Sequence, residues 1–307
     1  VLPGHKMVLQ GRGYSAVSLL SCGGLVSLIL SAVLVPLAFV VVPFLYAFVK
    51  PWTFWLVSVV CLYLVVRDQF PFRAFVILSL SGILGFFTLR SFTLSEPLLP
   101  LLTGLFGISS SLAALSTAVL PTQFNMGVRV PVLPVMKGSF LGMLSGFLPG
   151  IGSSQVASLS KTKSGEEFLV TIGALNASSI VMTLVTASVL GRARSGITAA
   201  VLQLSSVVTL STLLILVLSV LLAGGISFFS VHFIARWVAI HINRLKPRRI
   251  TIAIIVLNTI VVGLLSGVQG LGVLCIATSI GLLSIHFGCA RSHAMGCIIV
   301  PVLVGLW

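Results

Sequence analysis

The sequence predicts an all-α integral membrane protein, and three observations lead to this prediction. The chain of 307 residues is 58% hydrophobic and 7% charged, whereas a soluble domain carries about 25% charged residues. Its mean hydropathy is +1.23. The apolar residues form long continuous runs, not the alternating segments of about ten residues that build a membrane barrel. A cytosolic enzyme, a disordered chain and a disulfide-stapled secreted domain are therefore excluded.

Basic residues far outnumber acidic ones, and their placement indicates membrane topology. The 18 Lys and Arg against 4 Asp and Glu give a net charge of +14. They lie in ones and twos between apolar runs and not in the patch that a nucleic-acid partner requires. Loops that obey the positive-inside rule look like this. We therefore expect a lipid bilayer, and no nucleic acid, as a partner.

About nine apolar runs are predicted to be transmembrane helices, because crossing the ~30 Å hydrocarbon core takes about 20 apolar residues. In chain order they are Tyr14–Pro36, Phe48–Val66, Phe72–Leu89, Leu98–Leu120, Gly196–Leu222, Gly225–Asn243, Ile250–Ser266, Val268–Phe287 and His293–Trp307.

Two further stretches, residues 137–160 and 166–189, are predicted to be re-entrant, broken helical hairpins. The first contains Pro149, Gly150 and Gly152 at its middle, and the second is interrupted by small polar residues at 176–179. Proline removes a backbone donor, and glycine permits unusual backbone angles. Broken helices at membrane depth are tolerated only where they are buried in protein or line a wet cavity.

The distribution of charge favours hairpins over full crossings. If residues 1–13 face the cytoplasm and both hairpins return to their starting side, nearly all basic residues fall inside. Only Lys50 and Arg90 fall outside, and Arg236 lies within a span. The positive-inside rule thus predicts a multi-pass protein of the cell membrane with a cytoplasmic N-terminal loop.

The chain also repeats itself weakly, which predicts two related halves. Residues 11–17 (GRGYSAV) resemble residues 191–197 (GRARSGI), and Pro71-Phe-Arg resembles Pro247-Arg-Arg at a similar offset. We assign residues 1–130 to the first repeat and 131–307 to the second, which holds both hairpins. Because only ten residues precede Gly11, we expect the first repeat to lack its N-terminal hairpins here. The alternative is a natively asymmetric protein. Repeated halves are common in secondary transporters, with the binding site between them.

The strongest local signal for a binding site runs from Gly138 to Gln155. Glycines at 138, 142 and 146 recur every four residues and give one smooth helix face, suited to close helix packing. The Pro-Gly-Ile-Gly break follows, and a second half-helix beginning there would present unpaired N–H groups to a carboxylate or phosphate. A proline-kinked packing helix is the alternative. The candidate substrate-binding residues are Pro149, Gly150, Gly152, Ser153 and Ser154.

A second signal is the small polar run Asn176-Ala177-Ser178-Ser179 within an apolar stretch. The side chains of Asn176, Ser178 and Ser179 can ligate Na⁺ or hydrogen-bond a substrate without the cost of a full charge. An interhelical hydrogen bond is the alternative.

Arg236 is the strong charge placed within a predicted span, with His232 one turn earlier. An intramembrane arginine suggests a functional site. The alternative is that residues 225–243 form an amphipathic helix at the interface, from which Arg236 snorkels.

Several residue types suggest no chemistry of their own. The four acidic residues fall at span ends or in loops, so we expect no carboxylate proton relay and instead Na⁺ as the coupling ion. No nucleotide-binding, hydrolase or metal-ligand motif occurs, so neither an enzyme nor a cofactor is predicted. The five cysteines are expected to be small buried hydrophobes, and His286 and His293 to be bystanders.

Several of these segments resemble the large membrane subunit (TctA) of tripartite tricarboxylate transporters. Residues 146–155 (GFLPGIGSSQ) resemble that family's Pro-Gly hairpin, and residues 98–112 (LLPLLTGLFGISSSL) resemble its Gly-Leu-Phe-Gly-Ile segment. Residues 1–17 are similar to the stretch after the first repeat's hairpins in short, archaeal-type members. Residues 165–167 (GEE) and 174–177 (ALNA) resemble its Gly-x-x-Glu and Ala-Asn-Asn-Ala patterns.

Two departures from the family pattern fall where substrate choice is expected to reside. Leu175 stands in place of one asparagine, and residues 181–196 replace a proline-rich segment. The resemblance implies secondary transport of a small organic anion, such as a di- or tricarboxylate, driven by an ion gradient. It further implies a small membrane subunit and an extracytoplasmic binding protein as partners, and we allow for a homo-oligomer. The alternatives are a carrier of a phosphorylated lipid and a non-transporting scaffold subunit.

Overall fold

The computed structural model describes residues 3–90, 94, 96–115, 121, 123, 127–147, 156–157, 160, 162, 164–191, 195–204, 208–241 and 247–305. Within these ranges the chain consists of helices and their connections, and no strand occurs among them. This confirms the predicted all-α class. Six of the described helices are long and apolar enough to cross a membrane.

The chain forms two compact units, and each draws on two separate stretches of sequence. Unit 1 contains Val1–Thr53 and Leu120–Leu245, and unit 2 contains Phe54–Val119 and Lys246–Trp307. The predicted repeat boundary at 130/131 therefore does not separate the compact units. The helical runs Val35–Arg67 and Leu210–His241 have similar lengths, 33 and 32 residues, and each precedes a helix that begins at proline. This similarity agrees with the repeat, which stays a prediction.

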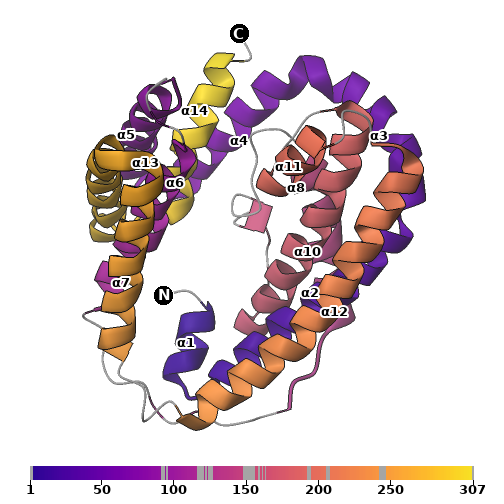
Figure 1. Ribbon diagram of the computed structural model, residues 1–307, viewed down its shortest axis with the longest axis horizontal. Coiled ribbons are helices and arrows are strands. Elements are labelled where there is room, and N and C mark those ends of the chain that lie inside the picture. The colour runs from indigo at the N-terminus through magenta and orange to yellow at the C-terminus, as the bar shows by residue number, and fades with distance from the viewer. Residues whose placement is uncertain are drawn as a thin grey trace. The chain divides into compact units, whose positions relative to one another are not determined.

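Unit 1 is organised around three closely packed helices, α2, α8 and α10 (Figure 1). Its helices are α1 (Pro3–Leu9), α2 (Gly13–Val33), α3 (Val35–Val49), η1 (Lys50–Trp52), α8 (Val132–Phe147), α10 (Gly165–Leu190), α11 (Gly196–Leu204) and α12 (Leu210–His241).

Small residues let the three helices approach one another. The predicted glycine face of α8 packs on α10: a Cβ at Gly142 would overlap Ser178 Oγ and the Leu175 carbonyl oxygen. On the other side of α10, a Cβ at Gly23 of α2 would lie 2.6 Å from the Val170 carbonyl oxygen. Backbones that approach this closely hold membrane helices together by dispersion and short polar contacts.

Unit 2 contains the remaining helices. These are α4 (Thr53–Arg67), α5 (Pro71–Arg90), α6 (Leu98–Leu102), the π-helical turn η2 (Thr103–Ile108), α7 (Ser109–Ala114), α13 (Pro247–His286), η3 (Arg291–Met295) and α14 (Gly296–Gly305). Its largest core cluster joins α5, η2, α13 and α14 through Ile77, Leu105, Ala277 and Cys297.

α13 is bent sharply at Gly267, whose φ of 64° and ψ of −165° lie outside the helical region. A residue with a side chain rarely adopts such a φ. Val262 and Leu274, on the two sides of the bend, belong to one core cluster with Ile108. The two arms therefore fold back on each other. This confirms the predicted separation of Ile250–Ser266 from Val268–Phe287.

Two predicted spans in unit 1 have different bounds in the structure. Gly196–Leu222 and Gly225–Asn243 are replaced by the short helix α11 and the single long helix α12. Gly224 lies inside α12, and its lack of a side chain makes room for Leu28 of α2. The apolar residues before Phe48, which were predicted to lie outside any span, form helix α3.

The predicted hairpin at 166–189 is wrong, because α10 runs through it as one continuous helix of 26 residues. The expected interruption at Asn176–Ser179 is absent. Ser178 Oγ donates to the Ala174 carbonyl oxygen one turn earlier, which satisfies the hydroxyl inside a regular helix. The first predicted hairpin is helical as far as Phe147, and its break at 149–152 lies outside the described residues.

The cysteines follow the expectation only in part. All five are free; Cys289 and Cys297 are buried, whereas Cys275 is exposed on α13.

Candidate functional site

The position of α10 is fixed at its first turn. Ser164 precedes the helix and its hydroxyl accepts a hydrogen bond from the Glu167 amide at 3.2 Å, which is a side-chain N-cap. Arg12 donates from Nη2 to Glu166 Oε1 at 2.6 Å and so joins the start of α10 to the start of α2. The two glutamates also lie where the helix dipole favours negative charge.

One face of α10 is fully buried and is joined to its neighbours by hydroxyl groups. Ser27 of α2 donates to the Ala174 carbonyl oxygen at 2.7 Å, and Ser139 of α8 lies 2.7 Å from Ser27 Oγ. The predicted site residue Ser178 belongs to this buried face, where it has no exposed surface. Among the described residues, its hydroxyl donates to the Ala174 and Leu175 carbonyl oxygens of its own helix and not across to another helix.

The opposite face of α10 is open and carries polar groups at helical spacing. Asn176 is exposed, and Ser179 and Thr183 are partly exposed three and seven residues further along. Ser179 Oγ accepts a hydrogen bond from Ser145 of α8 at 3.1 Å. Polar side chains that face outward from an apolar helix are costly in lipid unless they meet water or a solute. We define Asn176, Ser179 and Thr183 as the polar face of α10.

The sequence interpretation missed Thr183 and Ser145. Both were detectable in principle, because Thr183 follows Asn176 by two helical turns and Ser145 lies at the end of the glycine face. The assumption that the helix breaks at 176–179 concealed this spacing.

The C-terminal end of α8 lies against the same region of α10. Thr186 donates to the Gly146 carbonyl oxygen at 3.4 Å, and Phe147 packs edge-on to Tyr46 of α3 with ring centroids 6.5 Å apart. Pro149 follows Phe147 by two positions in the sequence. Five predicted site residues lie outside the described residues: Pro149, Gly150, Gly152, Ser153 and Ser154.

The cavity described in unit 1 is too small to hold a substrate. It has a volume of about 10 Å³ and is lined mainly by apolar residues of α2, α3, α8 and α10, including Val35, Met143 and Val185. A volume of this size holds at most about one water molecule.

Arg236 lies on α12, five positions before the helix ends at His241, and is exposed. His241 stacks on Trp237 at 4.8 Å between ring centroids. At 1.5 Å per residue the 32-residue helix is about 48 Å long, which exceeds the ~30 Å hydrocarbon core. Its last turns can therefore reach the interface, where Trp and a snorkelling Arg are favoured. As far as His241, where the described part of this stretch ends, residues from 225 on belong to the single helix α12.

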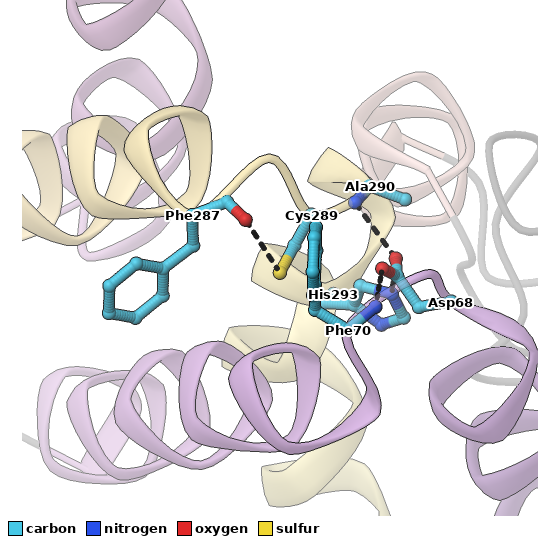
Figure 2. Close-up of polar contacts among 6 residues, drawn as sticks. All are labelled: Asp68, Phe70, Phe287, Cys289, Ala290 and His293. Carbon is cyan, nitrogen blue, oxygen red and sulfur yellow. Dashed lines mark hydrogen bonds and ion pairs between the residues drawn. The ribbon is translucent and has the colours of Figure 1, made fainter.

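A second polar centre lies in unit 2, between the α4–α5 connection and the segment after α13 (Figure 2). Asp68 accepts hydrogen bonds from the Ala290 amide at 3.0 Å, the Phe70 amide at 3.1 Å and His293 Nε2 at 2.9 Å. The side chains of Asp68 and His293 are only 7% and 3% exposed. His293, which was expected to be a bystander, thus has a structural role as the partner of Asp68, and no contact of His286 with this centre is described.

These donors control the ionisation of Asp68. Burial raises its pKa, but hydrogen bonds from the Ala290 and Phe70 amides and from His293 outweigh this effect. The pKa of Asp68 is therefore below its ordinary value. The thiol of Cys289, in the same connection, has a raised pKa, mainly because it is buried and also because Asp68 is close.

Among the described residues, no group of three or more His, Cys, Asp and Glu is placed to hold a metal ion. The side chains on the polar face of α10 are an amide and two hydroxyls, which can hydrogen-bond a solute or contribute oxygen ligands to a hard monovalent cation.

The described helices that are long and apolar enough to cross a membrane indicate a multi-pass membrane protein. A family model described as the tripartite tricarboxylate transporter TctA family matches residues 1–296. The chain belongs to this family, as its sequence motifs predicted, and the family is one of transporters that work in tripartite systems.

The chain is also similar to one curated relative over nearly its whole length. The uncharacterized protein MJ1079 of Methanocaldococcus jannaschii is 26% identical over 320 aligned residues, which cover 99% of this chain and 79% of the relative. No solved structure matches the chain.

Proposed function

We propose that the protein is a secondary active transporter of a small organic anion, a di- or tricarboxylate, driven by a Na⁺ gradient. The proposal places it in the cell membrane with the N-terminal loop in the cytoplasm. Its proposed partners are a small membrane subunit and an extracytoplasmic binding protein, and a homo-oligomer is compatible with it.

The observation that supports this function is the polar face of α10. Asn176 is an exposed amide in the middle of a helix whose opposite face is packed against α2 and α8. Its amide can donate to a carboxylate oxygen, and Ser179 and Thr183 add hydroxyls on the same face. A transported anion needs such donors, because an unpaired charge away from water is very costly.

The segment after α8 supplies the other half of the proposed site. Pro149, Gly150 and Gly152 would interrupt the helix, and Ser153 and Ser154 would begin a half-helix whose free N–H groups meet the anion. We rank this source of positive potential above Arg236, which the structure places near the end of α12.

Sodium coupling is proposed because oxygens without a full charge dominate this region. Hydroxyl, amide and carbonyl oxygens suit a hard cation. Asp68 does not belong to this region, since it lies in unit 2 with its carboxylate occupied by three donors.

The test measures uptake of radiolabelled citrate by reconstituted protein together with any accessory subunits. Asn176→Ala should lower apparent affinity about fivefold, as one lost hydrogen bond of about 1 kcal/mol predicts. Its melting temperature should stay unchanged, because Asn176 is exposed. The matched control is Asn258→Ala on α13, another exposed asparagine, whose amide bonds to its own helix at the Ile254 carbonyl oxygen.

Three outcomes would contradict parts of the proposal. Equal uptake by wild type and Asn176→Ala would remove the polar face from the site. Uptake that follows a proton gradient and ignores Na⁺ would reject the coupling ion. If citrate-like anions are not taken up and also do not stabilise the protein against heat, carboxylate transport is rejected and a scaffold subunit is favoured.

A further inference from the structure

Arginines gather at one end of unit 2. Arg67 ends α4 and Arg73 lies in the first turn of α5, directly across the short connection that holds Asp68. Arg73 Nη1 lies 3.5 Å from the Phe287 carbonyl oxygen, which places the end of α13 at the same point. Arg291 follows four residues later.

The bend in α13 brings two more arginines toward this end. Ser266, next to the bend, donates to the Glu96 carbonyl oxygen, so the bend lies near the start of α6 and far from the end of α7. The first arm of α13 is about 30 Å long at 1.5 Å per residue. Its first turn, which carries the exposed Arg248 and Arg249, therefore lies at the opposite end of the unit from Gly267. We call Arg67, Arg73, Arg248, Arg249 and Arg291 the arginine end.

Arg291 differs from the others because its guanidinium is partly buried and held in place. Its Nη1 donates to Ser110 Oγ of α7, a neutral acceptor. Among the described residues the ion pairs are Arg12–Glu166 and His293–Asp68, so Arg291 meets no carboxylate there.

The carboxylate of Asp68 is hydrogen-bonded to the segment that carries Arg291 but not to Arg291 itself. The Asp68 carboxylate accepts hydrogen bonds from the Ala290 amide and from His293 Nε2. These two residues flank Arg291 and Ser292 in the chain. The Phe70 amide is the third donor. Asp68 keeps its charge but forms no ion pair with Arg291 among the described residues, where the guanidinium donates to the neutral Ser110 hydroxyl. A partly desolvated guanidinium whose acceptor is neutral is a strong donor to an anionic oxygen.

The ring contacts at this end are those of a membrane interface. Arg73 lies over Phe70 at 4.5 Å and over Phe287 at 5.7 Å, and Arg67 lies over Tyr63 at 5.9 Å. Tyrosine is enriched at the headgroup level of a bilayer, and Lys and Arg are frequent just beyond the ends of membrane spans. An anion bound here would therefore meet the protein at the depth of lipid phosphates.

We propose that the arginine end binds the headgroup phosphate of an anionic lipid, with Arg291 as its central ligand and Ser110 as the residue that positions the guanidinium. Juxtamembrane arginines attract anionic lipids by about 1 kcal/mol each, and salt weakens this attraction. This lipid is a bound partner and not the transported substrate, so the inference is independent of the proposed function.

The test uses the full chain purified in a neutral detergent. Native mass spectrometry and melting temperature are measured with added phosphatidylglycerol or phosphatidylcholine. We expect phosphatidylglycerol to bind and stabilise more strongly, and Arg291→Gln to weaken its binding about fivefold. Arg291→Lys keeps the charge and should bind better than Arg291→Gln.

The matched control is Arg90→Gln, because Arg90 ends α5 at the other end of unit 2 and also lies over a ring, that of Phe86 at 4.5 Å. It should bind phosphatidylglycerol as the wild type does. If Arg291→Gln fails to fold, the double variant Arg248→Gln/Arg249→Gln, at exposed positions, should show the weakened binding instead.

Two results would overturn the inference. If Arg90→Gln weakens phosphatidylglycerol binding as much as Arg291→Gln or the Arg248/Arg249 double variant does, the arginine end is not a selective lipid site. Stabilisation by inorganic phosphate or citrate alone that is lost in Arg291→Gln would assign the site to a free anion and not to a lipid.

Discussion

Replacing Gly142 by alanine tests whether the contact between α8 and α10 determines the stability of unit 1. The new methyl group would overlap Ser178 Oγ and the Leu175 carbonyl oxygen, and would lie 2.9 Å from the Leu175 carbonyl carbon. Helix backbone cannot yield as a flexible side chain can, so the two helices must separate. Overpacking of this kind costs about 1–3 kcal/mol. Separation would also strain the Ser145–Ser179 hydrogen bond next to it.

The matched variant is Gly225→Ala on α12, where nothing lies within 4 Å of the added Cβ. Alanine is favoured over glycine in a helix by up to about 1 kcal/mol, so this variant should be neutral or stabilising. In a detergent-solubilised thermal unfolding assay, Gly142→Ala should melt several degrees below the wild type, since 1 kcal/mol is worth about 2–4 °C in a chain of roughly this size. If Gly142→Ala melts at or above the wild-type temperature while Gly225→Ala is neutral, the close packing of α8 on α10 is refuted.

Three further predictions concern charged groups. Because the pKa of Asp68 is lowered in the fold, its stabilisation is present above the unfolded pKa of about 3.9 and is lost as pH falls through the folded value. Wild-type melting temperature should therefore drop below about pH 4, and Asp68→Asn should be destabilised at pH 7 and lack that drop. Glu166→Gln removes a partly exposed ion pair with Arg12 and should change the free energy of unfolding by less than about 1 kcal/mol in a melting assay. Arg236→Gln should leave citrate uptake near wild type, and complete loss of uptake would move the site to α12.

Much of the fold could be predicted because long apolar runs ended at residues with a clear local meaning. α2 and α5 begin after Arg12 and at Pro71, close to the predicted bounds. The two arms of α13 were separated correctly because Gly267 stands between two apolar runs of membrane length. In these cases the signal and its cause lie in the same few residues.

The errors arose where a residue's role depends on a distant helix. Gly224 resembles a loop residue in the sequence, but it serves to admit Leu28 of α2. The polar run that includes Ser178 resembles a helix break, but its small side chains fit the glycines of α8. The Asp68–His293 pair joins residues 225 positions apart, and no local pattern announces it. Of the candidate site residues on α10, Asn176 and Ser179 lie on one open face and Ser178 is buried, and their part in a site stays a prediction.

The hydroxyl bond between α2 and α10 has a consequence for biosynthesis. Ser27 and its acceptor on Ala174 are separated by 147 residues. At a synthesis rate of about 5–20 residues per second, α2 emerges roughly 7–30 s before its partner exists. During that interval the hydroxyl of Ser27, which is buried in the finished protein, has no α10 to bond. A newly made α2 therefore needs the insertion machinery, or a temporary helix neighbour, to shelter its polar face until the middle of the chain has been translated.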